Sequence, residues 1–192
     1  MIAILKYNAG NVKSVENALV SLGYDCLITD DETELKNASK VIIPGVGEAS
    51  SAMQYLRARG LDSVITELTQ PVLGICLGLQ LMCQNSEEGN TPGLGIFDVN
   101  VKRFPATDVV PHMGWNNLTD LKGPLYNGLD ADAHFYFVHG YYAEVGADTS
   151  SVCNYILPFS ASFQKNNFYA VQFHPEKSAA DGTALLKNFL SL

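Results

Sequence analysis

The sequence predicts a mixed α/β fold, in which a mostly parallel central sheet is flanked by helices and extended by antiparallel strands. Two observations support this prediction. The first half of the 192-residue chain alternates short apolar runs with amphipathic stretches, as parallel β-α-β units do. The second half is instead rich in aromatic and β-branched residues separated by Gly, Asn, Asp and Pro, which is typical of antiparallel strands.

Four apolar runs in the first half are rich in Val, Ile and Leu, which indicates parallel strands that are buried on both faces. The amphipathic stretches between them predict helices, and the last of these is interrupted at Gly60. The expected strands are 1–7, 24–28, 40–45 and 71–76, and the expected helices are 11–22, 31–38 and 48–69.

Five further runs predict antiparallel strands that extend the same sheet. A closing helix is expected over 181–190, with Asp181 as its N-cap. No linker or repeat interrupts the pattern, so we expect a single domain over 1–192. The five runs are 97–104, 134–145, 151–157, 160–164 and 168–173.

Composition argues against several partners. The chain has 12 Lys and Arg against 20 Asp and Glu, and its basic residues do not cluster, so no nucleic acid is expected to bind. We see neither a signal segment nor an apolar run near the roughly 18 residues of a membrane span, and therefore expect a cytoplasmic protein without membrane contact. Three of the four cysteines are expected to be free thiols in the core: Cys26, Cys83 and Cys153.

The stretch "PVLGICLGLQ" (71–80) sets Cys76 apart from the other cysteines. Gly74 and Gly78 would allow a buried strand to turn sharply into a helix, which presents the residue at the turn at the carboxyl edge of the sheet. Backbone N–H groups and the helix dipole favour a thiolate there. Cys76 is therefore predicted to be a nucleophile, and a structural cysteine in a tight joint is the alternative.

The stretch "FHPEKS" (173–178) offers a base and a group to orient it. An apolar strand ends at His174, and Glu176 follows two residues later, so in an extended segment both side chains point the same way. Cys76, His174 and Glu176 would then be nucleophile, base and orienting carboxylate. The other three histidines lack metal-ligand spacing, and neither a metal nor another cofactor is expected.

An oxyanion hole is the remaining requirement, and "PGVG" (44–47) is suited to it. Its two glycines allow peptide N–H groups to turn toward a ligand, so Val46 and Gly47 are expected donors. The N–H of Leu77, next to the nucleophile, is the third expected donor. A dinucleotide-binding loop is disfavoured because Ser50 stands where its third glycine is required.

Together, "GICLGLQ", "PGVG" and "FHPEKS" resemble the class I glutamine amidotransferase family over almost the whole chain. This resemblance implies a flavodoxin-like domain that hydrolyses L-glutamine to glutamate and ammonia through a cysteine thioester. For Glu88, charge agrees with a contact to the substrate ammonium group, although a solvated acidic loop is the alternative. The substrate-binding residues that the resemblance implies are Gly45, Gln80, Glu88, His139 and Gly140.

Three more stretches, "YNAGN" (7–11), "PHMGWN" (111–116) and "FVHGYY" (137–142), resemble the branch of this family that serves histidine biosynthesis. That resemblance implies a 1:1 heterodimer with a (β/α)8-barrel cyclase subunit, which receives the ammonia. For Trp115, a core or sheet-edge position is the alternative. The residues expected at the partner interface are Asn11, Trp115, Tyr136 and Lys177.

Other functions remain open at this point. Glutaminase subunits for anthranilate, aminodeoxychorismate or pyridoxal phosphate synthesis would share the triad. A free-standing cysteine hydrolase of the same fold would need no partner. A non-catalytic subunit is disfavoured because all three triad residues are present.

Overall fold

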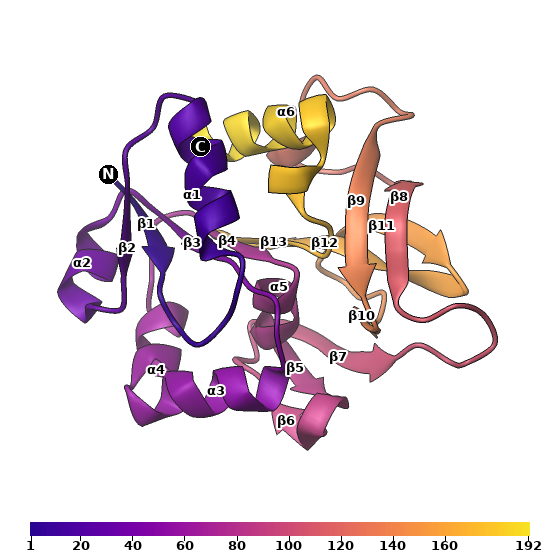
Figure 1. Ribbon diagram of the computed structural model, residues 1–192, viewed down its shortest axis with the longest axis horizontal. Coiled ribbons are helices and arrows are strands. Elements are labelled where there is room, and N and C mark those ends of the chain that lie inside the picture. The colour runs from indigo at the N-terminus through magenta and orange to yellow at the C-terminus, as the bar shows by residue number, and fades with distance from the viewer.

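A seven-stranded sheet runs through the centre of the molecule in the computed structural model, which describes residues 1–192 (Figure 1). Its strands are β1 (Ile2–Leu5), β2 (Cys26–Thr29), β3 (Lys40–Ile43), β4 (Val72–Ile75), β11 (Thr149–Tyr155), β12 (Leu157–Lys165) and β13 (Phe168–Val171). The strand order is β11-β12-β13-β4-β3-β1-β2. All pairs from β13 to β2 are parallel, and β11 and β12 add an antiparallel edge. The predicted mixed, mostly parallel α/β class is confirmed.

Helices cover both faces of this sheet, as Figure 1 shows. Apolar side chains of α1 and α6 pack in one buried cluster, and those of the other helices pack in a second cluster across the sheet. One face carries α1 (Val12–Ser21) and α6 (Ala179–Leu190), and the other carries α2 (Glu32–Asn37), α3 (Ala49–Ala58), α4 (Leu61–Thr66) and α5 (Leu77–Met82). The expected helix over 48–69 is divided at Gly60, which has a left-handed φ of 68°.

Two small sheets and three 3-10 turns complete the structure. A four-stranded sheet is ordered β10-β7-β5-β6, and β8 pairs with β9 as an antiparallel ribbon. The strands are β5 (Cys83–Ser86), β6 (Thr91–Pro92), β7 (Phe97–Arg103), β8 (His112–Asn117), β9 (His134–His139) and β10 (Tyr141–Ala143); the turns are η1 (Glu88–Asn90), η2 (Pro124–Tyr126) and η3 (Pro175–Lys177).

The expectation that all late strands extend one sheet antiparallel was wrong in two respects. The runs 97–104 and 134–145 lie in the small sheets, and the second run is divided at Gly140. The run 168–173 forms β13, which joins the main sheet parallel to β4, with Val171 opposite Ile75. Strand β12 runs antiparallel to β13, so β13 enters the sheet in the same direction as β4. The amino-acid composition of a strand does not indicate its direction relative to its neighbours.

The predicted closing helix is present, but Asp181 does not cap it. Helix α6 begins at Ala179, after Ser178. The Asp181 carboxylate instead accepts the backbone N–H of His134 at 2.9 Å, which ties α6 to the start of β9. All four cysteines are free thiols, with Cys83 and Cys153 buried as expected and Cys26 only half-buried.

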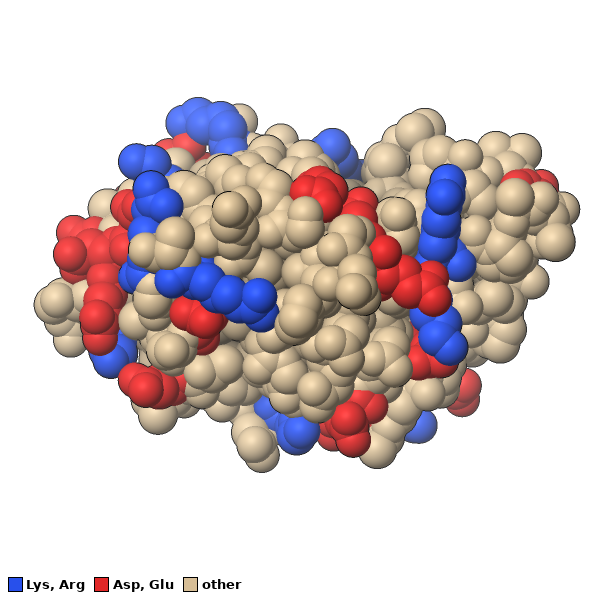
Figure 2. All heavy atoms as spheres, turned by 90° about the horizontal axis from the view of Figure 1, so that it is seen from below, with Lys and Arg blue, Asp and Glu red and all other residues tan.

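Charged side chains of both signs are interspersed on the face that carries α3 and α4, with broad uncharged areas between them (Figure 2). None of the helices is long and apolar enough to cross a membrane.

The joint between β4 and α5 depends on close backbone packing against β3. A Cβ atom on Gly78 would lie 2.0 Å from the carbonyl oxygen of Ile43. Carbonyl groups inside a sheet cannot move away independently, because they are held in the hydrogen-bond ladder. A glycine is therefore required here for lack of space.

We expect Gly78→Ala to destabilise the protein by about 3 kcal/mol, since an overpacked joint must displace β3 or α5. Urea unfolding monitored by circular dichroism measures this change. Gly140→Ala is the control, because its Cβ would meet nothing closer than Val110 Cγ1 at 3.8 Å. The control should change stability by less than about 1 kcal/mol. Equal effects of the two substitutions would contradict the packing argument.

Candidate functional site

Cys76 lies at the turn between β4 and α5, as the glycine pattern predicted. Its φ of 54° and ψ of −103° are rarely adopted by an L-residue and cost on the order of 1–3 kcal/mol. The turn is held by the Cys76 N–H, which donates to the Val171 carbonyl oxygen of β13 at 2.8 Å. The side chain is 6% exposed, so the thiol lies just beneath the surface at the carboxyl edge of the sheet.

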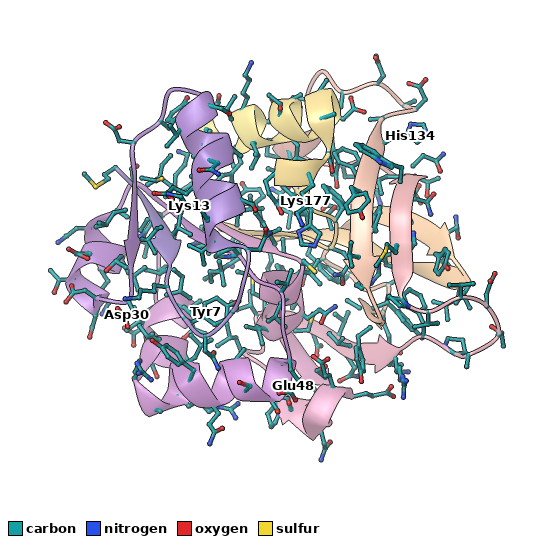
Figure 3. All side chains as sticks on the ribbon, viewed as in Figure 1. Tyr7, Lys13, Asp30, Glu48, His134 and Lys177 are labelled. Atoms are coloured by element: carbon teal, nitrogen blue, oxygen red, sulfur yellow. The ribbon has the colours of Figure 1, made fainter.

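His174 and Glu176 form a buried pair beside this edge. The distance between His174 Nδ1 and Glu176 Oε1 is 2.8 Å, and both side chains are almost fully buried. The predicted pairing is present, but its geometric reason was wrong, because Glu176 lies in η3 and not in an extended segment. In the view of Figure 3, Lys177 marks the end of this turn near the centre of the molecule.

Electrostatics favour a charged imidazole at His174. Burial alone would lower the pKa of His174, but interactions with Cys76 and Glu176 outweigh burial and raise this pKa to about 10. The ring nitrogen that faces away from Glu176, Nε2, is buried and has no hydrogen-bond partner. It is therefore the nitrogen that is free to exchange a proton with a reacting group.

Asn11 also contacts this pair, although sequence resemblance placed it at a partner interface. Its side-chain nitrogen donates to Glu176 Oε1 at 2.6 Å and lies 3.4 Å from His174 Nδ1. Asn11 precedes α1 in a left-handed conformation with a φ of 75°, which Asn tolerates better than most residues. The carboxylate of Glu176 is thus held from two sides.

The "PGVG" loop lies directly against the turn at Cys76. The N–H groups of Val46 and Gly47 make no hydrogen bond within the protein, so two of the three expected oxyanion donors are free. The third is engaged, because the Leu77 N–H donates to the Gly45 carbonyl oxygen at 3.2 Å. The Val46 carbonyl oxygen in turn accepts the N–H of Gly10 at 3.0 Å, which fixes the orientation of that peptide.

Two of the proposed substrate residues make protein contacts around this loop. Glu88 accepts the Ala49 N–H at 2.7 Å, so its carboxylate lies at the start of α3, just after the loop. Burial raises the pKa of Glu88, and nearby Glu48 adds to the effect. Gln80 is buried, and its side-chain nitrogen donates to the carbonyl oxygen of Tyr141 at 3.1 Å. Gln80 is therefore a buried, hydrogen-bonded residue and not a solvent-exposed one.

The segment around His139 and Gly140 lies beside Cys76. The Cys76 thiol lies 3.8 Å from the neighbouring Val138 carbonyl oxygen. His139 is buried, with Nδ1 at 2.7 Å from the Tyr141 carbonyl oxygen and Nε2 at 3.0 Å from His112 Nδ1. The Gly140 carbonyl oxygen is occupied by the N–H of Phe104.

The other expected interface residues lie on the outside of the same region. Trp115 of β8 is 53% exposed, which excludes a core position, whereas the two-stranded ribbon of β8 and β9 agrees with the sheet-edge alternative. Trp115 faces Tyr136 of β9 with ring centroids 5.9 Å apart. Lys177 is exposed directly after Glu176. No group of three or more His, Cys, Asp or Glu side chains is placed to hold a metal ion.

Sequence reasoning missed one buried residue that touches Cys76. The side-chain nitrogen of Gln172 lies 3.6 Å from Cys76 Sγ. A signal was available, because Gln172 precedes His174 by two residues, and alternation along a strand end places such residues on one face.

Comparison with known proteins adds three findings. The family model for class I glutamine amidotransferases matches residues 3–192. The imidazole glycerol phosphate synthase subunit HisH of Bacteroides fragilis strain YCH46 is 55% identical, with 100% of this chain and 99% of that protein covered. The HisH subunit of Haemophilus influenzae strain Rd is 47% identical over 98% of this chain and 96% of its own length.

Solved structures agree at the level of the fold. A crystal structure described as a putative GMP synthase protein from Thermoplasma acidophilum has a TM-score of 0.77 at 20% identity, covering 100% of this chain and 92% of its own. A structure described as a glutamine amidotransferase has a TM-score of 0.75 at 19% identity, with 99% and 97% covered.

The buried histidine pair generates a prediction about pH. Burial lowers the pKa of His112 to about 4, and burial together with the neighbouring histidines lowers that of His139 to about 3. An unfolded histidine titrates near 6.5, so below about pH 6.5 the unfolded chain binds more protons and the folded state loses stability. The loss is up to about 1.4 kcal/mol per pH unit for each histidine.

His112→Phe removes one of these groups and retains a ring that can stack on Tyr155, which lies 4.0 Å away between centroids. Urea unfolding at several pH values compares the variant with the unmodified protein. Between about pH 7 and 5.5, the difference in unfolding free energy should shift by about 1 kcal/mol in favour of the variant. Parallel pH profiles would contradict a neutral, buried His112.

Proposed function

Because the chain belongs to the class I glutamine amidotransferase family, we propose that it is the glutaminase subunit of an imidazole glycerol phosphate synthase. The observation that carries this proposal is the 55% identity to a HisH subunit over the full length of both chains. The Cys76 turn, the buried His174–Glu176 pair and the effect of Cys76 in raising the pKa of His174 support glutamine hydrolysis as the reaction. The same identity favours this synthase over those that make anthranilate, aminodeoxychorismate or pyridoxal phosphate.

In the proposed reaction, Cys76 Sγ attacks the side-chain amide carbon of L-glutamine. The tetrahedral oxyanion is held by peptide N–H groups of the Val46–Gly47 segment and, when it is released from Gly45, by that of Leu77. His174 protonates the departing nitrogen, the C–N bond breaks, and ammonia leaves a thioester on Cys76. His174 then removes a proton from water, which attacks the thioester and releases glutamate and the free thiolate.

Substrate binding is proposed for the residues around this centre. The Glu88 carboxylate is suited to the α-ammonium group of glutamine, because opposite charges favour a charge-assisted hydrogen bond. The Gln80 side-chain oxygen makes no hydrogen bond within the protein and can receive a donor from the substrate. Gly45 and the backbone of the His139–Gly140 segment would form the remaining walls.

The ammonia is proposed to pass to a (β/α)8-barrel cyclase subunit in a 1:1 heterodimer, in the cytoplasm. The sequence contains no phosphate-cradling loop of its own, so a phosphorylated acceptor must bind elsewhere. Exposed Trp115 and half-exposed Tyr136 offer the partner an apolar aromatic surface. Asn11 and Lys177 would link that surface to Glu176.

We expect Cys76→Ala to abolish glutamine-dependent synthesis by the complex and to leave synthesis from added ammonia unchanged. The acceptor site lies on the partner, so only the ammonia supply would be lost. Cys26→Ala is the matched control, because this half-buried thiol lies in β2, away from the site. Product formation from each nitrogen source is the measurement, and equal loss of both activities would refute the proposal.

We also expect the chain alone to turn over glutamine slowly, since the Leu77 N–H is occupied by Gly45 in this structure. One missing oxyanion donor typically costs on the order of 100-fold or more. Glutaminase turnover is to be measured for the chain alone, with the cyclase, and with the cyclase plus its nucleotide ligand. Equal turnover in all three would instead indicate a free-standing hydrolase.

A further inference from the structure

The side chain of Gln172 is fully buried, and one end of its amide lies against the nucleophile. Its nitrogen is 3.6 Å from Cys76 Sγ, and its oxygen is 3.1 Å from the side-chain nitrogen of Gln80. Gln172 directly follows β13, the strand that also holds the Cys76 N–H. The nucleophile is therefore fixed to the same short segment through both its backbone and its sulfur.

The direction of these hydrogen bonds is determined by one backbone carbonyl. The Tyr141 oxygen can only accept, so the group of Gln80 that faces it must be the NH2 group. The same NH2 group lies against Gln172, which must therefore present its oxygen to Gln80. The Gln172 amide is thereby turned with its own NH2 toward the sulfur of Cys76. His139 Nδ1 also lies 2.7 Å from the Tyr141 oxygen.

We propose that Gln172 is a thiolate-binding residue, which donates an N–H to Cys76 Sγ, and that Gln80 is a positioning residue for it. A thiolate can only accept hydrogen bonds, and bonds to an ionised partner are about twice as strong as neutral ones. Desolvation of an anionic sulfur is costly unless such a donor is present. The inference rests on the proposed function, in which Cys76 is the nucleophile.

The role assigned to Gln172 extends to both halves of the reaction. The sulfur is anionic before it attacks and becomes anionic again when the thioester breaks. Between these stages the sulfur is neutral, because its electron pair forms the S–C bond of the thioester. The hydrogen bond from Gln172 to Cys76 Sγ is therefore strongest in the free enzyme and in the step that releases glutamate. Gln80 would act on the chemistry through Gln172, in addition to any contact with substrate.

Alkylation of Cys76 by iodoacetamide tests the proposal without any need for glutamine hydrolysis. Gln172→Met retains the length of the side chain and removes the donor. At about pH 6, carboxamidomethylation of Cys76 should slow by roughly tenfold or more, because the reacting anionic sulfur loses a stabilising donor. Peptide mass spectrometry of the full-length chain separates this site from Cys26, which serves as an internal reference in the same sample.

Gln164→Met is the matched control, because Gln164 lies on β12 and its side chain makes no hydrogen bond within the protein. It should alkylate at the unmodified rate. Native circular dichroism of Gln172→Met combined with an unchanged Cys76 rate would overturn the proposal, as would equal changes at Cys76 and Cys26. If Gln172→Met does not fold, Gln80→Met removes only the hydrogen bond that orients Gln172, and it should slow alkylation of Cys76 by roughly threefold. An unchanged rate in that variant would likewise overturn the role.

The test also separates this inference from the proposed function. Slower alkylation of Gln172→Met supports the hydrogen bond to the thiolate whatever reaction Cys76 performs. Glutamine-dependent synthesis that survives Cys76→Ala would refute the function and leave the alkylation result intact.

Discussion

The sharp turn at Cys76 is the constraint on which the rest of the site depends. A non-glycine residue with a φ of 54° is stable there only because its surroundings leave no alternative. A Cβ atom on Gly74 would come within 2.9 Å of the Gly78 backbone, and one on Gly78 would overlap the backbone of β3. The turn therefore packs tightly against β3 and β4. This packing holds the thiol and the Leu77 N–H at the carboxyl edge of the sheet.

Burial of so many polar groups is possible because nearly all of them have partners. The Tyr141 oxygen accepts from both Gln80 and His139, and Glu176 accepts from Asn11 and His174. A buried hydrogen-bond network is stable only when each of its polar groups has a hydrogen-bond partner. The notable exceptions are His174 Nε2 and the second oxygen of Glu176, which have no partner although they are buried. An unpaired nitrogen at that position is what proton exchange with a substrate requires.

Sequence reasoning recovered the parts of the fold that are encoded locally. The apolar runs identified the four parallel strands of the first half, and Gly74 and Gly78 identified the turn at Cys76, since both patterns reflect the immediate steric needs of the chain. Pairing over long distances was not recoverable in this way. The parallel position of β13 beside β4, and the hydrogen bond from Asp181 to β9 in place of a helix cap, depend on partners that no local pattern specifies.

For the candidate site, the sequence indicated which residues come together, but it did not indicate how their side chains are oriented. His174 and Glu176 were paired correctly, although through a 3-10 turn instead of an extended segment. Asn11 was expected at a partner interface, and the contact of its amide with the Glu176 carboxylate was not foreseen. Gln172 was missed although it stands two residues before His174, because its contact with Cys76 joins segments far apart in the sequence.

The position of β13 has a consequence for the biosynthesis of the protein itself. Cys76 and His174 are adjacent because β13 inserts next to β4, yet β13 is the last strand of the chain, and only α6 follows it. During translation, the N-terminal strands and the turn at Cys76 can form before β13 and His174 have been synthesised. A nascent chain that ends before His174 therefore lacks the histidine that the proposed reaction requires.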